Sequence, residues 1–406
     1  MKQRVAITGL GVVSPIGLTV EAFAQNLSKG VSGIRPISVF DASTLPSRIA
    51  GEVPWTDPIA RDRKQTFAIE AARQAMAQAT ACGSWPAGIG TLSLGIGLEL
   101  FSLDDMAELG AGRGQLPDSI AARLTFLQTP SDLCAHTLAH QHGLTAPPRV
   151  HVSACAAGTD AIGAGYRLVA TGRSDWVLAG GADSMINPLG VGGFCKLSAL
   201  SRRNSEPVAA SRPFDRGRDG FVLGEGAAML VLEPLDNALR RGAEILAELC
   251  GYGNSFDAFG ISEPHPEGRG AVQAMERALA DAGLRPEQVD VINSHGTGTP
   301  KNDVVETLAI KRVFSDHARR MPVCATKSMI GHLISAAGAV EAVASIVGLR
   351  GGWVHPTLNL DDPDPACDLN YVPRESREWP AAFVMSNSFA FGGQNASVIF
   401  RRADAA

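Results

Sequence analysis

A cysteine at a strand–turn–helix elbow is the first group in this sequence whose type and place could do chemistry. Residues 149–170 begin as an alternating β-branched run and change at Cys155 to small residues, followed by a helical spacing of apolar residues. The partial positive charge of a helix N-terminus lowers a thiol pKa and favours the nucleophilic thiolate. A free cysteine is also a common small hydrophobe in protein cores, so this stretch alone leaves both interpretations open.

Two histidines occupy glycine-flanked turns that follow other predicted strands. His295 follows residues 290–294 in the segment SHGTGT, and His332 follows residues 322–325 in the segment TKSMIGH, with Lys327 five positions before it. A lone histidine is more often structural, but two in such turns favour a shared site. One thiol and two imidazoles indicate covalent acyl chemistry, in which the thiolate attacks and the imidazoles donate to an oxyanion or move protons.

The composition is that of an ordinary soluble enzyme. The chain has 406 residues, of which 45% are apolar and 19% charged, and its 44 glycines indicate many tight turns. The net charge of −5 gives no electrostatic case for nucleic acid or an anionic membrane as a partner. We find no uninterrupted apolar stretch long enough to span a bilayer, and the glycine-broken apolar run near the N-terminus is unlike a signal peptide.

The cysteines and paired histidines do not predict a metal site. Seven scattered cysteines without a CxxC pair favour a reducing, cytoplasmic compartment over a disulfide framework or a zinc site. His136 and His140 share a helix face at metal-like spacing, with Asp132 one turn earlier, but no further motif supports a metal there. We therefore expect a structural role for these histidines and no bound metal.

The order of predicted elements repeats along the chain. This repetition indicates an α/β fold built from two related halves, residues 1–242 and 243–406. The strand, turn and Ala/Gly-rich helix around Cys155 correspond to the unit that contains His332. Small residues in both helices predict a close helix–helix contact at the centre of the molecule, with the preceding turns facing a shared site.

Three local predictions concern other segments. Residues 9–11 (GLG) are expected to form a tight turn after a strand, because the third glycine of a dinucleotide fingerprint is missing. Residues 57–81 are expected to contain a helix that Asp57 caps, with Pro58 at its first position. Residues 188–194 (PLGVGGF) are expected to form a glycine-rich loop.

Several segments together resemble one known family, the β-ketoacyl-[acyl carrier protein] synthases of the thiolase fold, above all their elongating type I/II class. The segments are SACAAGTDAI, AGGAD with NPLGVGGF, SRPFDRGRDGFVLGEGA, NSHGTGTPKND, TKSMIGHLISAAGAVE and NSFAFGGQNA. They run in the family's order and cover nearly the whole chain. The resemblance implies a five-layered αβαβα thiolase-like fold, a homodimer with a heterodimer as the alternative, and no cofactor beyond the phosphopantetheine of the acyl carrier protein.

The resemblance also implies catalytic roles. Cys155 would accept the acyl chain as a thioester, while His295 and His332 would bind the malonyl thioester, promote its decarboxylation and stabilise the enolate. Both imidazoles would be neutral and would donate through Nε2. Lys327 and Glu341 would form a buried supporting pair near His332.

Further residues would contact the substrate if the resemblance holds. The backbone N–H groups of Cys155 and Phe391 would form an oxyanion hole, and Phe391 would also gate the acyl pocket. Thr297 and Thr299 would contact the phosphopantetheine arm. The remaining residues expected to contact the substrate are Leu98, Phe101, Phe194 and Phe389.

Three departures from the family pattern concern the acyl pocket and its gate. Ala390 stands where the family usually has glycine, and because alanine resists positive φ we expect a different gate geometry or mobility. Gln394 replaces the commoner threonine. Leu98 and Glu99 occupy a loop that is usually glycine-rich, so Leu98 and Phe101 are expected to shorten or reshape the pocket.

A basic patch is expected to dock the acidic carrier protein. Its members are Arg61, Arg63 and Lys64, at the start of the helix in residues 57–81, together with Lys196 and Arg203.

The sequence as a whole predicts an acyltransferase, a 3-oxoacyl-[acyl carrier protein] synthase of fatty-acid or related chain elongation. The His/His pattern argues against the initiating class, and neither Cys324 nor Cys367 lies in the second-cysteine motif of thiolases. One alternative is a ketosynthase subunit of a specialised type II polyketide or polyene pathway. The other is a non-catalytic chain-length-factor-like partner, against which the retained Cys155 argues.

Overall fold

A computed structural model describes residues 2–56, 62–97, 111 and 130–404 of the chain. The strands are β1 (Val5–Val13), β2 (Ile34–Pro36), β3 (Ile49–Gly51), β4 (Gly90–Ile96), β5 (Arg149–His151), β6 (Trp176–Ser184), β7 (Leu223–Pro234), β8 (Ala247–Phe256), β9 (Val291–Asn293), β10 (Pro322–Cys324), β11 (Trp353–Val354), β12 (Asn370–Tyr371), β13 (Arg377–Glu378), β14 (Phe383–Phe389) and β15 (Gln394–Arg401). The helices are α1 (Val20–Ser28), α2 (Arg63–Ala79), α5 (Pro130–Gln141), α6 (Ala157–Ala170), α7 (Pro188–Lys196), α8 (Leu235–Arg240), α9 (Arg269–Ala282), α10 (Pro300–Phe314), α11 (Lys327–Ile330) and α12 (Ala337–Gly351). Three short 3₁₀ turns lie next to the central helices and the last hairpin: η1 (Ala154–Ala156), η5 (Ile334–Ala336) and η6 (Phe391–Gly393).

One mixed sheet runs through the molecule and repeats its own order about its middle. The order is β12-β10-β9-β14-β15-β8-β1-β7-β6-β4-β5, and β1 pairs antiparallel with β8 in the register Val5↔Leu249. Outward from β1 lie β7, β6, β4 and β5, and outward from β8 lie β15, β14, β9 and β10, with matching strand directions. The prediction of two related halves agrees with this order, while the division at residue 242 stays a prediction.

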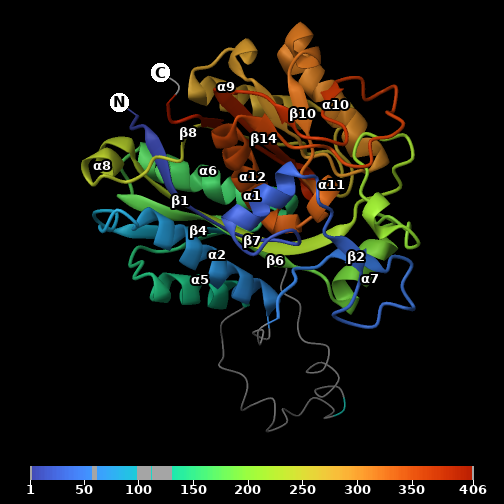
Figure 1. The fold of residues 1–406 in the computed structure, drawn as a ribbon, viewed down its shortest axis with the longest axis horizontal. Helices are drawn as coiled ribbons and strands as arrows, with labels where there is room; N and C mark the ends of the chain where they lie inside the picture. The colour runs from blue at the N-terminus through green and yellow to red at the C-terminus, as the bar shows by residue number, and fades with distance from the viewer. Residues whose placement is uncertain (1, 57–61, 98–110, 112–129, 405–406) are drawn as a thin grey trace.

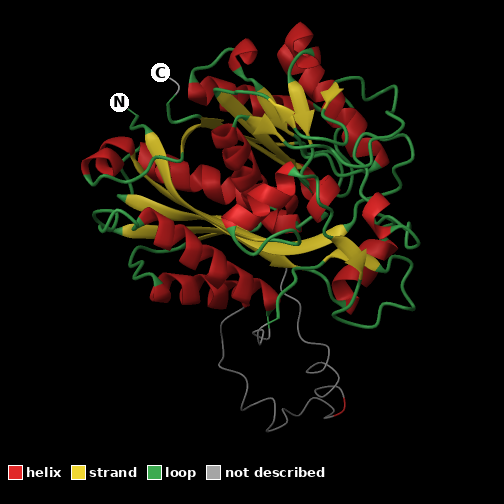
Figure 2. Ribbon diagram, viewed as in Figure 1, coloured by secondary structure: helices red, strands yellow, loops and turns green. Residues whose placement is uncertain are grey.

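The helices lie in three layers around the two arms of the sheet. Helices α6 and α12 pack against each other and against the inner faces, α2 and α5 cover one outer face, and α9 and α10 cover the other (Figures 1 and 2). The predicted five-layered αβαβα arrangement is therefore confirmed. It places the turns before α6 and α12 together at the centre.

Glycines allow the central helices to approach closely. A Cβ on Gly338 of α12 would lie 1.9 Å from Thr159 Oγ1 of α6, and one on Gly158 would lie 2.9 Å from the Ala339 nitrogen. Only residues without a side chain fit at these positions, because a real Cβ would overlap the facing helix. The predicted central helix–helix contact is confirmed.

The prediction of a turn at residues 9–11 is wrong, because β1 continues through them. Their glycines instead admit helix α2, since a Cβ on Gly11 would lie 1.8 Å from the Ala71 carbonyl oxygen and one on Gly9 would lie 2.0 Å from that of Ala75. Sequence reasoning mistook a close approach between helix and strand for a chain reversal.

Two predicted helix boundaries also need correction. Helix α2 begins at Arg63, where the Asp62 side chain accepts a hydrogen bond from the Lys64 N–H as an N-cap. Asp57 and Pro58, the predicted start, lie outside the described residues. Residues 188–194 are not a loop but the body of α7, because Asn187 caps the helix and Pro188 suits its first turn.

One described segment, residues 334–351, bears on the expectation about membrane spans, and Glu341 and Arg350 interrupt its apolar run. It is long and apolar enough to cross a bilayer by length and composition, but 83% of it is buried inside the protein. It comprises η5 and α12, so its apolarity reflects packing on all sides at the centre of the fold.

Candidate active site

The structure brings Cys155, His295 and His332 together from three separate turns. Cys155 lies in η1 between β5 and α6, His295 lies two residues beyond β9, and His332 lies between α11 and η5. The Cys155 sulfur and one ring nitrogen of each histidine lie within 4.8 Å of one another, and all three residues are buried. The imidazole centroids are 5.3 Å apart with the rings nearly perpendicular. The two halves of the chain therefore form one site, as the sequence predicted.

Two residues in left-handed backbone conformations shape this site. Ala154, immediately before the cysteine, has φ 47°, and Ile334, at the equivalent place before α12, has φ 46°. A side chain resists this conformation, so the surrounding structure must hold it. The strained turns allow the chain to present Cys155 and His332 before it enters each central helix.

The predicted lowering of the Cys155 pKa by the helix N-terminus is wrong. Burial dominates and raises the pKa of the thiol to about 11. The backbone N–H groups of Phe391 and Cys155 and the charge of Lys327 act in the opposite direction. At neutral pH the resting group is therefore a thiol.

Hydrogen bonds fix which ring nitrogen of each histidine carries the proton. The Lys327 ammonium donates to Nδ1 of His295 over 3.2 Å, and the Ile334 N–H donates to Nδ1 of His332 over 3.1 Å. A nitrogen that accepts a hydrogen bond holds no proton, so each neutral ring carries its proton on Nε2. Burial lowers the pKa of both histidines well below the ordinary value, and Lys327 lowers it further. Both rings are therefore neutral Nε2 donors.

Lys327 is paired with Glu341 in the protein interior. The Lys327 ammonium donates to Glu341, which lies on α12, and both side chains are almost fully buried. Burial raises the pKa of Glu341 to about 7, against the opposing effect of Lys327. The sequence placed this pair near His332, but its direct contact is with His295.

Two buried carboxylates that the sequence analysis did not assign to the site support the His295 turn. Glu306 accepts hydrogen bonds from the His295 and Gly296 N–H groups at 2.8 Å each, and Asp303 accepts from Thr297 and Gly298 at 3.2 Å each. Burial raises the pKa of Glu306 to about 7. The sequence does show these acidic residues close to the glycine-rich turn of His295. They were not assigned to the site, because acidic residues are equally expected in the first turns of the helix that follows.

The predicted threonines lie in the turn that follows His295. The hydroxyl oxygens of Thr297 and Thr299 are 2.8 Å apart, with Thr297 buried and Thr299 half-buried. Their contact with a phosphopantetheine arm stays a prediction.

Aromatic side chains enclose the other sides of the site. The ring centroid of Phe221 lies 5.2 Å from that of His332, 5.4 Å from that of Phe194 and 6.5 Å from that of Phe391. Phe389 lies 6.1 Å from the His295 ring. Phe221 was missed from sequence, because nothing in an isolated phenylalanine distinguishes a site wall from a core residue.

Ala390 does not strain the gating loop in this structure. Its φ is −100°, an ordinary extended value, while Gly392 and Gly393 take the positive φ values of 82° and 78°. The expectation of an altered gate geometry at Ala390 rested on a positive φ that the residue does not adopt. The Ala390 N–H donates to the backbone oxygen of Gln394, so the latter contributes a main-chain contact that any residue type could supply.

Part of the predicted basic patch faces inward. The Arg63 guanidinium pairs with the fully buried Glu225, and Lys64 is itself buried, with its ammonium 3.2 Å from Asp62. The prediction that Arg63 and Lys64 belong to an exposed docking patch is therefore wrong for this structure. Lys196 is exposed and Arg203 half-buried, 3.5 Å from Glu206.

Several predicted residues cannot be placed. Arg61, Leu98, Glu99 and Phe101 lie outside the described residues.

The electrostatics of the site disfavour a metal. Cys155, His295 and His332 form the one group of metal-ligand type found among the described residues. A cation bound there would face the Lys327 ammonium, which already donates to His295. Binding would also require a thiolate from a group whose pKa is about 11. The His136 and His140 rings stack 6.2 Å apart and belong to no such group.

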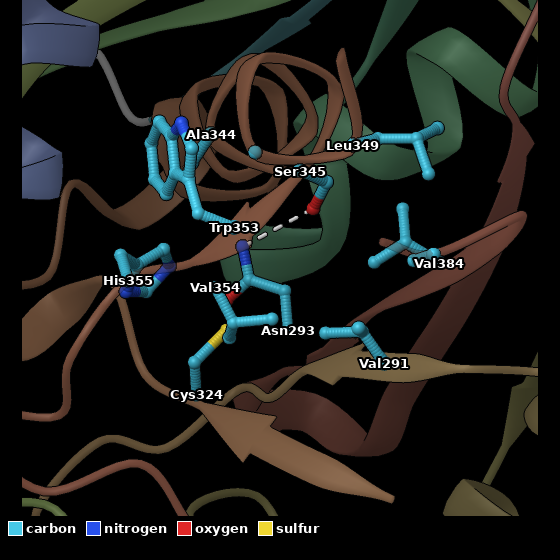
Figure 3. Close-up of a pocket in the computed structure, with 12 residues that line it drawn as sticks. Val291, Asn293, Cys324, Ala344, Ser345, Leu349, Trp353, Val354, His355 and Val384 are labelled. Carbon is cyan, nitrogen blue, oxygen red and sulfur yellow. Dashed lines mark hydrogen bonds between the residues drawn. The ribbon is translucent and has the colours of Figure 1, made fainter. Parts of the chain in front are cut away.

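A separate small pocket holds a second cysteine (Figure 3). Cys324 lies there with Trp353, Val384 and Asn293, whose amide donates to Ser345 over 3.2 Å. The Cys324 thiol donates to the Ile292 carbonyl, and burial raises its pKa. Cys324 is thus not part of the catalytic group, in agreement with the sequence argument against a thiolase.

Comparisons with known proteins agree with this fold and site over the whole chain. A family model described as the β-ketoacyl synthase N-terminal domain matches residues 2–238, and the C-terminal domain model matches residues 246–361. The 3-oxoacyl-[acyl-carrier-protein] synthase 2 of Coxiella burnetii is 42% identical over 99% of both chains. A β-ketoacyl synthase structure from Burkholderia phymatum is 35% identical with a TM-score of 0.88, covering 99% of this chain and 100% of that one. A type II polyketide ketosynthase, solved in complex with its acyl carrier protein and bound to a hexaketide, is 31% identical with a TM-score of 0.88 and full coverage of both chains.

Fold, site and matches define an acyl-transferring condensing enzyme of the thiolase-like class. Within that class, the chain belongs to the β-ketoacyl synthase family, in its elongating I/II type.

Removal of the buried charges of Lys327 and Glu341 should change the pH dependence of activity. The role that the family resemblance implies for His295 and His332 needs neutral rings, and the lowered pKa values of both place the acid limb of kcat/KM below pH 6.5 in the wild type. The variant K327M/E341Q removes both charges together, so the histidine pKa values should rise and the acid limb should move to higher pH. Loss of the donor to His295 Nδ1 should also lower kcat on the order of 10²-fold. A pH–rate profile of carbon dioxide release tests this, and an unmoved acid limb would contradict the role of Lys327.

Proposed function

We propose that this protein catalyses the decarboxylative Claisen condensation of an acyl thioester on Cys155 with malonyl-acyl carrier protein, in fatty-acid chain elongation. The observation that carries the proposal is the meeting of one thiol with two histidines, each with a ring nitrogen within 4.8 Å of the other ligand atoms and each carrying its proton on Nε2. A thiol can hold the acyl group, and neutral imidazole donors stabilise an enolate without quenching it by proton transfer.

In the first step the Cys155 sulfur attacks the acyl carbon of the carrier-bound thioester. The bond from that carbon to the carrier sulfur breaks, and the thiol proton passes to the departing carrier sulfur. The backbone N–H groups of Cys155 and Phe391, which lower the pKa of the Cys155 thiol, would donate to the thioester oxygen as it develops negative charge. The Lys327 charge favours the transient thiolate.

In the second step malonyl-acyl carrier protein loses its carboxylate. The carbon–carbon bond breaks, carbon dioxide leaves, and the electron pair forms an enolate whose oxygen accepts hydrogen bonds from Nε2 of His295 and His332. The enolate carbon attacks the acyl carbon, and the Cys155 sulfur departs and takes up one proton. The products are a 3-oxoacyl chain on the carrier and a free thiol.

The substrate arm and acyl chain are proposed to use the remaining predicted residues. Thr297 and Thr299 would contact the phosphopantetheine, which carries the substrates without a further cofactor. Phe194 and Phe389 would border the acyl chain, and Leu98 and Phe101 would limit its length.

Acylation of Cys155 is the direct test of the reaction. Incubation with a graded series of acyl-carrier proteins should add one acyl mass to the Cys155 peptide, and carbon dioxide should follow when malonyl-carrier is added. Cys155→Ala should abolish the acyl addition and the additional carbon dioxide release that depends on the acylated enzyme. Cys195→Ala, in α7, is the matched thiol control and should keep them. Acylation of the Cys155→Ala protein would contradict the proposal, and a long-chain preference would contradict the role of Leu98 and Phe101.

The fatty-acid pathway is proposed over a specialised polyketide pathway. The full-length fatty-acid relative is 42% identical, whereas the type II polyketide ketosynthase is 31% identical. That ketosynthase was solved with its acyl carrier protein, which supports a carrier protein as the partner here. In the present protein the surface that docks the carrier protein is proposed to include Lys196 and Arg203, near Phe194.

Charge reversal tests this docking surface. Lys196→Glu with Arg203→Glu should raise the KM for the carrier protein severalfold and leave kcat nearly unchanged, because an acidic partner loses attraction but the catalytic group is untouched. Arg240→Glu is the control, since α8 and α7 lie on opposite sides of the molecule (Figure 1). Equal KM values for the docking variant and the control would refute the surface.

A homodimer is proposed through the edge of the sheet. Strand β5 ends the sheet order; Val150 within it is 37% exposed and Val152 just after it is 62% exposed. An exposed edge strand with apolar side chains favours pairing with a second copy. The seven free cysteines support a cytoplasmic location for this dimer.

Light scattering of an edge variant tests the dimer. Val152→Asp should convert a dimer into monomers, because the new charge would be buried at the pairing edge. Ile261→Asp is the matched control, since Ile261 is an equally apolar and 88% exposed residue away from β5. A dimer that survives Val152→Asp would rule out this edge.

A further inference from the structure

The backbone immediately after His332 is strained. Ile334 has φ 46°, a conformation that is a genuine outlier for a β-branched residue. Such a conformation is unfavourable for a residue with a side chain and persists only when neighbouring groups hold it. The same residue supplies the N–H that hydrogen-bonds to Nδ1 of His332 over 3.1 Å. The proton position on His332 therefore depends on a strained peptide that must be fixed from outside.

Asp183 supplies that fixation from the other half of the chain. Its Oδ2 accepts a hydrogen bond from the Ser335 N–H over 3.0 Å, directly after the strained residue. Its Oδ1 accepts from the N–H of Ser184 over 2.8 Å, which ties the carboxylate to the end of β6. Two successive N–H groups, of Ile334 and Ser335, are thus held by His332 and Asp183.

The carboxylate has little freedom to adopt another position. Asp183 is 1% exposed, and a Cβ on Gly97, just beyond β4, would lie 2.3 Å from its Oδ2. Burial raises the pKa of Asp183 to about 6, while its N–H donors and the charge of Lys64 act in the opposite direction. At neutral pH Asp183 is therefore an anion, which makes its hydrogen bond to Ser335 a charge-assisted one. The buried Lys64 thereby gains a role inside the protein in place of carrier docking.

We propose that Asp183 is a positioning residue for His332: by holding the Ser335 N–H it keeps Ile334 in the left-handed conformation that directs its own N–H to His332 Nδ1. This inference rests on the proposed function, in which His332 Nε2 stabilises the enolate. Asp183 does not touch the substrate, so its effect on the reaction passes through His332.

The two steps of the reaction should respond differently to its loss. Decarboxylation needs a correctly oriented His332, so it should slow when η5 relaxes. Acylation needs the Cys155 sulfur, and the negative charge of Asp183 raises the pKa of that thiol. Neutralising Asp183 should therefore leave acylation unchanged or make it faster. A merely structural role would slow both steps together.

The experiment compares these steps in Asp183→Asn, which keeps the shape of the side chain. Carbon dioxide release from malonyl-acyl carrier protein should fall on the order of tenfold to a hundredfold, because a small misplacement of a reacting group has that cost. The rate of acyl addition to Cys155, followed by mass spectrometry, should not fall. Glu233→Gln is the matched control: it is a buried carboxylate hydrogen-bonded to Thr8 and Arg241, and its change should leave the ratio of the two rates unaltered.

A second variant tests the strain itself and provides another folded protein for the comparison. Glycine adopts φ 46° without strain, so in an Ile334→Gly background Asp183→Asn should cost much less decarboxylation than it does in the wild type. Unchanged decarboxylation in Asp183→Asn, an equal loss of both steps, or the same loss in both backgrounds would each overturn the inference. Absence of both reactions in the wild-type protein would instead refute the proposed function.

Discussion

The chemistry of this protein depends on one buried ammonium group. Lys327 is 1% exposed and lies between Glu341 and Nδ1 of His295. A buried charge requires a partner, and Glu341 supplies it from the central helix α12. The remaining donor capacity is directed at an imidazole, which determines the tautomer of His295. The same charge lowers the pKa of both histidines and opposes the rise in the pKa of Cys155. One cation thus keeps the donors neutral and favours the nucleophile.

The duplicated fold explains how two distant turns meet. In each half of the fold, the central helix with small residues follows a turn that contains a left-handed residue. That residue is Ala154 before α6 and Ile334 before α12. Glycines at the start of α6 and α12 let the helices approach almost to backbone contact. The first turn presents the thiol and the second presents His332, so the close packing of the helices sets the distance between them.

Buried carboxylates then fix the loops around this centre. Glu306 and Asp303 hold the His295 turn through its N–H groups, and Asp183 holds the Ser335 N–H after His332. Backbone N–H groups at a catalytic turn have no helix or strand partner of their own, so side-chain acceptors satisfy them. The contacts of Glu306 and Asp303 are local in the sequence, whereas the contact of Asp183 with Ser335 joins segments 152 residues apart.

The sequence by itself determined the residue types, the order of elements and hence the family, and it singled out Cys155 and the two histidine turns as the candidate site. It could not determine which groups are buried or which ones meet, because these depend on distances through space. Tertiary packing placed Lys327 against His295, turned Arg63 toward Glu225 and buried Lys64. It also reversed the expected shift of the Cys155 pKa, because the desolvation of a buried thiol outweighs the favourable helix terminus. Local patterns report what a residue can do, whereas the dielectric surroundings and partners that decide what it does exist only in the folded chain.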